Sequence, residues 1–223
     1  MSRTTERPSS ATAARGRRHS ATPLQRQLAG GATSQPSALD AFRQARRTFL
    51  AGDRVDMGAL ARTLNVDRAT LYRWVGSREQ LLTEILWSLI TRTIATLQTE
   101  HLNRSAAGPC GESAAAAVIN GTVRGVIANQ GMQRFLDREG DLALRLLTTK
   151  TTDFEARLVD LIGQLLAEEA SAGRLNAALP AADLPYVLVR IMESYIYIGL
   201  ITGEHPDPDR AARVINALLP ASV

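Results

Sequence analysis

The stretch "NVDRATLYRWVGSREQLL", residues 65–82, contains two helix starts in close succession. Asp67 can cap a short helix of about two turns, which a glycine then ends. Ser77 and Gln80 form a capping box that opens another helix at once. Asn65, which tolerates a positive φ, fits a tight turn just before Asp67. The stretch therefore predicts a turn, a short helix and then a long helix.

Helical signals continue on both sides of this stretch. Ser37 and Asp40 make a capping box upstream, and Asp56 can cap a second helix. Downstream, Thr152 and Glu155 form a further capping box. Apolar spacing places the remaining helices at about 112–129, 132–138, 141–148, 153–172 and 183–202, with a last short one opened by Asp207-Pro208. No strand pattern is evident, so the sequence predicts an all-α fold.

The composition is that of a globular chain with a substantial core. Hydrophobic residues make up 45% of the 223 residues and charged residues 22%. No apolar run is long enough to span a bilayer, and the N-terminus lacks the apolar segment of a secretory signal. The single cysteine, Cys110, cannot form an internal disulfide. We therefore expect a cytoplasmic protein that does not enter a membrane.

The positive charge is concentrated at the N-terminus. Residues 1–36 hold six arginines and one glutamate, whereas the net charge of the whole chain is only +4. We expect this segment to be a mostly disordered basic arm, with one short helix at about 23–29. Two interpretations stay open: an arm that contacts DNA phosphates, and a leader that only improves solubility.

Residues 37–82 have the spacing of a helix-turn-helix domain, in which the third helix enters the DNA major groove. Arg68 and Thr70 lie where such a helix presents side chains to base edges. Tyr72 and Arg73 suit phosphates, and Arg78 starts the next helix, whose N-terminal end favours an anion. The alternative is an amphipathic surface helix with a solvated basic face.

The segments "LARTLNV", "DRATLYRWV" and "GSREQLL" resemble the DNA-binding region of the TetR family of bacterial repressors. This resemblance covers residues 39–90 and implies a homodimer that binds a double-stranded DNA operator and is released by a small apolar effector. The resemblance implies that DNA bases are contacted by Arg68, Thr70 and either Arg73 or Trp74. It implies that DNA phosphates are contacted by Tyr72 and Arg78. Asn65 replaces the usual turn glycine, and Arg78 replaces the usual lysine.

A finer resemblance involves "TLYRWVGSREQLL", "FLDREGDLALRLLT" and "ESYIYIGLITGEHPDPDRA". These segments are similar to QsdR-type regulators, actinobacterial TetR relatives that control the degradation of quorum-sensing lactones. The resemblance implies acyl-homoserine lactones or related γ-lactones as effectors.

Residues 83–223 then correspond to an effector-binding and dimerisation body. The helix at 183–202 is apolar nearly all round, and the helix at 153–172 carries a second apolar stripe, which suggests that both pack on a core and on a second subunit. We expect dimer contacts at Leu158, Leu161, Ile162, Leu165, Val187, Ile191 and Ile198. The alternative is a single thick monomer core.

Polar or bulky residues on otherwise apolar helices are the candidates for a ligand pocket. They are Trp87, Asn120, Val123, Phe135, Arg145 and Met192. Arg190 and Glu193 interrupt the most apolar helix, and we expect them to pair with each other or with Arg145 or Glu139.

No catalytic or metal-binding pattern competes with this interpretation. His19, His101 and His205 share neither a helix face nor the spacing of metal ligands. We therefore expect no cofactor, no metal and no enzymatic activity. The alternative function is a helical carrier of small molecules whose basic arm binds nucleic acid without reading its sequence.

Overall fold

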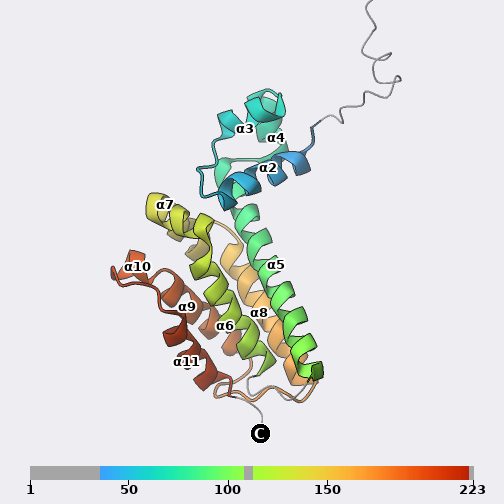
Figure 1. The fold of residues 1–223 in the computed structure, drawn as a ribbon, viewed down its shortest axis with the longest axis vertical. Helices are drawn as coiled ribbons and strands as arrows, with labels where there is room; N and C mark the ends of the chain where they lie inside the picture. The colour runs from blue at the N-terminus through green and yellow to red at the C-terminus, as the bar shows by residue number, and fades with distance from the viewer. Residues whose placement is uncertain (1–35, 108–112, 221–223) are drawn as a thin grey trace, which may run out of the picture. The chain divides into compact units, whose positions relative to one another are not determined.

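The computed structural model describes residues 36–107 and 113–220, and within these ranges every regular element is a helix (Figure 1). The expected short helix at 23–29, nearly all of the basic arm, and Cys110 lie outside the described residues. Within the described ranges no helix is both long and apolar enough to cross a membrane.

Three short helices form the head: α2 (Ala38–Leu50), α3 (Met57–Leu64) and α4 (Arg68–Val75). The predicted starts of all three are confirmed. The capping box at Ser37 is present, and the carboxylates of Asp56 and Asp67 accept hydrogen bonds from the first turns of α3 and α4. Asn65 ends α3 with a φ of 54°, the left-handed conformation that the tight turn requires.

The long helix α5 (Arg78–Ala107) continues from the head into the body without a break. The capping box predicted for its start is present, because Ser77 and Gln80 exchange side-chain and backbone hydrogen bonds of 2.7 and 3.1 Å. The boundary expected between residues 82 and 83 therefore lies inside one continuous helix.

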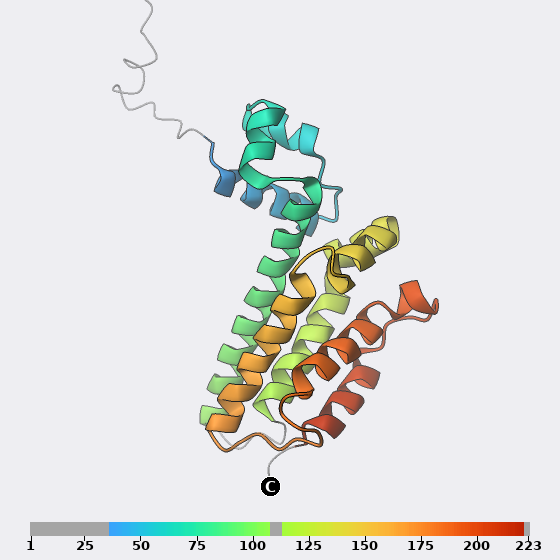
Figure 2. The same cartoon turned by 180° about the vertical axis from the view of Figure 1, so that it is seen from behind.

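The body consists of α5 with six further helices: α6 (Ala114–Ala128), α7 (Gln130–Thr148), α8 (Phe154–Ser171), α9 (Leu184–Ile196), α10 (Ile198–Ile201) and α11 (Pro208–Leu218). Helix α6 lies between α5 on one side and α9 and α11 on the other, and α8 packs along α9 (Figures 1 and 2). Ile119, Ile162 and Leu188 are fully buried where these helices meet.

The break predicted between the helices at 132–138 and 141–148 is confirmed, because these segments are the two halves of α7 and Glu139 between them leaves helical geometry. The single helix expected at 183–202 is wrong, since it is divided at Tyr197 into α9 and α10. The apolar periodicity hardly changes at Tyr197, so only tertiary packing decides whether the backbone bends there.

The capping box predicted at Thr152 is not formed. The hydroxyl of Thr152 donates 2.5 Å to the carbonyl of Leu146, at the end of the preceding helix. Asp153 takes the N-cap position of α8 instead, without a side-chain capping bond. The same hydroxyl still accepts 3.3 Å from the amide of Phe154, so Thr152 bridges the end of α7 and the start of α8.

Candidate functional site

One face of α4 is exposed and carries the side chains expected to contact DNA. Arg68, Tyr72 and Arg73 are exposed, while Leu71 on the opposite face is fully buried and fixes the helix to the head. Arg68 and Tyr72, four residues apart, lie on the same side of the helix, and Arg73 is turned about 100° from Tyr72 and borders that side. The face can therefore offer two guanidinium groups and a phenol to an anionic surface.

Thr70 and Trp74 are placed differently, since both are half-buried. The hydroxyl of Thr70 donates 2.9 Å to the carboxylate of Asp67, which also accepts from the Thr70 amide at 2.7 Å. These bonds, above all the one from the Thr70 amide, lower the pKa of Asp67. Thr70 therefore helps to define the start of α4 in this conformation.

Arg78 points into the protein rather than outward, which differs from the phosphate contact expected for it. Its two terminal nitrogens donate 2.8 and 2.7 Å to the two carboxylate oxygens of Glu139, and its Nε donates 2.6 Å to the carbonyl of Val55. The bidentate bond from Arg78 lowers the pKa of Glu139 and keeps it ionised. The sequence did not reveal this pair because its members are far apart in the chain.

The first half of α7 supports the head at further points. Arg134 and Arg138 each donate 3.0 Å to backbone carbonyls just after α2, those of Ala51 and Gly52. Phe135 packs edge-on against Phe49, with ring centroids 5.6 Å apart. We call this set of contacts, together with the Arg78–Glu139 ion pair, the α7 clamp.

Gly131, at the start of α7, allows a particularly close approach of the two parts. A Cβ atom added there would lie 2.3 Å from the backbone carbonyl oxygen of Phe49. No side chain larger than hydrogen fits this position without moving α7 away from the head.

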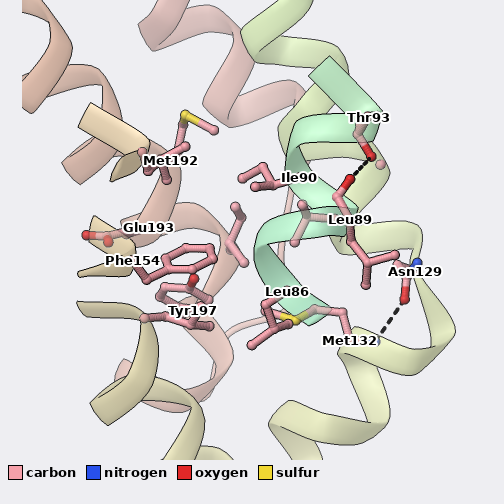
Figure 3. A pocket seen from close by; sticks show the side chains of 15 residues that line it. Leu86, Leu89, Ile90, Thr93, Asn129, Met132, Phe154, Met192, Glu193 and Tyr197 are labelled. Atoms are coloured by element: carbon pink, nitrogen blue, oxygen red, sulfur yellow. Dashed lines mark hydrogen bonds between the residues drawn. The ribbon is translucent and has the colours of Figure 1, made fainter. Parts of the chain in front are cut away.

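The body contains a partly open apolar cavity of about 70 Å³ between α5, α6, α7, α8 and α9 (Figure 3). Most of its lining is aliphatic or aromatic: Leu86, Leu89, Ile90, Val126, Met132, Leu147, Phe154, Leu158, Met192 and Ile196. Gly125 and four polar residues, Thr93, Asn129, Glu193 and Tyr197, complete it. The cavity therefore suits an apolar guest with few polar groups.

Two of the polar residues are already engaged in local bonds. The hydroxyl of Thr93 donates 2.9 Å to the carbonyl of Leu89, and the side-chain oxygen of Asn129 caps α7 by accepting 2.9 Å from the amide of Met132. Tyr197 is buried, and its hydroxyl bonds to none of the described residues. Burial raises the pKa of Tyr197, so this hydroxyl keeps its proton.

Glu193 pairs with Arg190 at 3.0 Å, as expected from their spacing, and Arg190 also pairs with Glu155 on α8. Burial raises the pKa of Glu193 to about 7, against the opposing effect of Arg190. In Figure 3 its carboxylate points away from the other labelled side chains of the cavity. Neither Arg145 nor Glu139, the other partners considered, takes part.

Of the six residues expected to line a pocket, the structure places only Met192 on this cavity. Trp87 packs edge-on against Phe154 and is covered by Arg157, whose guanidinium lies 4.2 Å from the ring centroid. The other four are engaged elsewhere: Asn120 donates to Asn216, Val123 is in the core, Phe135 is in the α7 clamp and Arg145 pairs with Glu79. A polar or bulky side chain on an apolar helix was thus a poor guide to the cavity.

The residues expected at a dimer contact mostly face the chain's own core. Leu158, Ile162 and Leu165 are buried, and the rest are only half-buried: Leu161, Val187, Ile191 and Ile198. The face of α8 and α9 that remains open carries smaller side chains, with Gly163, Ala167 and the exposed ring of Tyr186 around a shallow depression. The apolar periodicity of the sequence located both helices, but their largest side chains face the core of the same chain.

Within the described ranges, no three histidine, cysteine, aspartate or glutamate side chains come together as metal ligands. His101 is buried at the end of α5 and His205 is exposed in the loop before α11.

Residues 110–220 match the family model described as the tetracyclin repressor-like C-terminal domain. Among solved structures, the chain is similar to the R. erythropolis transcriptional repressor QsdR from the TetR family, with a TM-score of 0.69 and 26% sequence identity. That match covers 83% of this chain and 95% of the other. No curated protein gave a significant match. With its helix-turn-helix head and all-helical body, the chain belongs to the TetR family of regulators.

Proposed function

We propose that this regulator is a repressor that binds a pseudo-palindromic operator as a homodimer in the cytoplasm and leaves it when a small apolar effector enters the cavity. The observation that carries the proposal is the double role of α7. This helix contributes Met132 and Leu147 to the cavity wall, and the same helix holds the head through the α7 clamp. A guest that displaces α7 must therefore also displace the head.

The exposed face of α4 is the proposed reading surface. Arg68 can bond two acceptors of a guanine edge at once, while Tyr72 and Arg73 reach phosphates or neighbouring bases. Two copies of α4 in one dimer would have to lie about 34–36 Å apart to enter successive major grooves. Small changes in the angle of the heads are enough to lose that match.

The size of the cavity supports a mechanism in which the effector forces the helices apart. A cavity of roughly 150 Å³ with similar walls admits benzene. The cavity here has about 70 Å³, so an effector larger than a few heavy atoms must widen it. Because interiors are closely packed, widening moves whole helices rather than single side chains. A coupling of about 1–3 kcal/mol between effector and DNA would suffice for regulation.

We propose the open face of α8 and α9 as the dimer contact. Gly163 and Ala167 permit close approach of a second helix pair, and the ring of Tyr186 is 55% exposed although the guanidinium of Arg190 lies 5.2 Å from its centroid. The half-buried residues Leu161 and Val187 lie on the same two helices and could extend the contact.

The decisive experiment measures binding of the full chain to the DNA upstream of its own and neighbouring genes, beside a scrambled duplex of equal length, across a salt series. A preference of about 10³ or more for one natural duplex at physiological salt supports a sequence-reading regulator. Equal, steeply salt-dependent binding to both duplexes contradicts it and favours the carrier with a non-specific basic arm.

Release by effectors is tested on the bound duplex. Acyl-homoserine lactones and γ-lactones, the effectors implied by the resemblance to QsdR-type regulators, are the first compounds to titrate. The test variant is Leu89→Phe, whose larger side chain should fill the cavity while the residues of the head stay unchanged. This variant should keep DNA binding and lose the response to the effector. Release that is equally efficient from Leu89→Phe would place the effector elsewhere.

A further inference from the structure

Tyr197 differs from the other polar residues that line the cavity in the hydrogen bonding of its side chain. It lies at the junction of α9 and α10, beside Phe154 and across the cavity from Leu86 and Met132 (Figure 3). Only 6% of its surface is exposed, yet its hydroxyl has no hydrogen-bond partner among the described residues. The Tyr197 oxygen is not among the fully enclosed unpaired polar atoms of the described residues, so it stays accessible to water or to a guest.

The polar groups around Tyr197 determine what it can offer to a guest. The hydroxyl of Thr93 already donates its proton to Leu89, and the Asn129 side-chain oxygen already accepts from Met132. The Tyr197 hydroxyl keeps its proton because burial disfavours the phenolate. It is therefore a donor that faces the cavity without an assigned acceptor.

The charges around the cavity limit the guest further. No lysine or arginine is among the residues that line it, so a carboxylate or phosphate guest would be buried without a counter-charge. Glu193 is the only acid in the lining, and Arg190 already pairs with it. A cationic guest would have to compete with that ion pair. An uncharged guest meets neither obstacle.

We propose that the Tyr197 hydroxyl binds the carbonyl oxygen of an uncharged effector whose apolar remainder lies among Leu86, Ile90 and Met192. This assignment rests on the proposed function and names the chemical class of its effector: a neutral ketone, ester, lactone or amide with an aliphatic tail. Acids and amines of the same size should bind more weakly because their charge would be buried, and plain hydrocarbons should bind about 3- to 10-fold more weakly because they lack the one hydrogen bond. Tyr197 then serves as the residue that determines specificity, whereas the aliphatic walls supply most of the affinity.

The test uses ligands that differ in a single group. 2-Heptanone is compared with 2-methyl-1-heptene, in which a methylene replaces the carbonyl oxygen, and with heptanoate and heptylamine. Binding of each to the full chain, without DNA, is measured by titration calorimetry. Tyr197→Phe removes only the hydroxyl, and because that hydroxyl has no partner among the residues that the structure describes, the variant should fold normally. Tyr195→Phe is the matched control, since Tyr195 does not line the cavity.

The wild-type protein should bind the ketone about 3- to 10-fold more tightly than its methylene analogue, as one hydrogen bond allows. Tyr197→Phe should remove this preference, and Tyr195→Phe should keep it. Heptanoate and heptylamine should bind more weakly than the ketone.

Three results would overturn the proposal. They are no binding of the ketone to the wild-type protein, equal binding of ketone and methylene analogue, and an unchanged preference in Tyr197→Phe. Since no DNA is present, these outcomes are separate from operator binding. If the protein prefers the ketone but binds no operator, the assignment of Tyr197 stands and the proposed function fails. If it binds an operator but shows no preference for the ketone, the proposed function stands and the assignment of Tyr197 fails.

Discussion

Arg68 occupies the first position of α4, where its guanidinium lies against Gly58 of α3. A Cβ atom added to Gly58 would be 2.7 Å from a terminal nitrogen of Arg68, so the missing side chain at Gly58 leaves room for the arginine. Arg68 forms no ion pair with any described residue. Its charge is therefore available to a partner such as a guanine edge.

Replacing Arg68 by alanine should reduce the preference for the operator over a scrambled duplex by about 1–3 kcal/mol, while binding to the scrambled duplex changes little. Tyr72→Phe should instead weaken binding to both duplexes alike, because a phosphate contact carries no sequence information. Competition binding at fixed salt measures both effects. An equal loss on both duplexes for Arg68→Ala would show that Arg68 contacts only phosphate.

Glu193 makes stability depend on pH in a direction opposite to that of most carboxylates. Burial raises its pKa from 4.5 to about 7 in the folded chain, with Arg190, Glu155 and Tyr197 as its charged or titratable neighbours. A group with a raised folded pKa favours folding below its unfolded pKa, and this contribution is lost as the pH rises through the folded value.

Glu193→Gln should therefore gain stability relative to the wild type between about pH 4.5 and 7 and keep a constant advantage above that range. Urea unfolding across the pH series measures the difference, which we expect to reach up to about 3 kcal/mol. Glu204→Gln, at an exposed position, should show no such trend. A flat difference for Glu193→Gln would contradict the raised pKa.

At the scale of elements, α7 connects the two candidate sites. Its kink at Glu139 separates a first half that supports the head from a second half that reaches the cavity through Leu147. Met132 also reaches the cavity from the first half, so the wall and the clamp share one rigid turn of helix. The ion pair of Arg78 and Glu139 holds the kink against the start of α5.

Glu139→Gln should lower the free energy of unfolding at pH 7 by about 1–3 kcal/mol, because it leaves the half-buried Arg78 without its counter-charge. The pKa of Glu139 is lowered in the fold, so its contribution is present above the unfolded pKa and disappears as the pH falls through the folded value. The difference in the free energy of unfolding between Glu139→Gln and the wild type should therefore become smaller at acid pH.

Asp209→Asn, which breaks the exposed pair with Arg124, serves as the control and should cost less than about 1 kcal/mol. A Glu139→Gln variant as stable as this control would show that the Arg78–Glu139 pair is not a support of the head.

At the scale of the whole molecule, regulation of this kind requires two heads at a defined spacing, and so a dimer. Ala167→Arg places an unpaired charge on the proposed contact of α8 and α9, where burial would cost about 3 kcal/mol or more. Sedimentation velocity should show a monomer with unchanged helical content and a loss of operator binding. Thr96→Arg, on the exposed side of α5, should remain dimeric. A dimeric Ala167→Arg would place the contact on another face.

Local signals in the sequence were enough to predict the helical class and most of the helix ends. Ser37, Asp56, Asn65 and Asp67 act through bonds within a few residues, so their effect is readable without the rest of the chain. The head and its exposed arginines follow directly from these local signals. The family resemblance rested on the same short segments.

Contacts between distant segments could not be predicted in the same way, because they depend on how the helices pack. Arg78 is a residue type that suits a phosphate contact. The kink of α7, however, places a carboxylate oxygen of Glu139 2.8 Å from a terminal nitrogen of Arg78. A helix that is apolar nearly all round, such as α9, carries no mark of which side meets the core, so the sequence could not identify the cavity wall. Tyr197 became a candidate only when α9 ended beside it and left its hydroxyl without a partner. Such choices depend on packing between residues far apart in the chain, which local patterns do not encode.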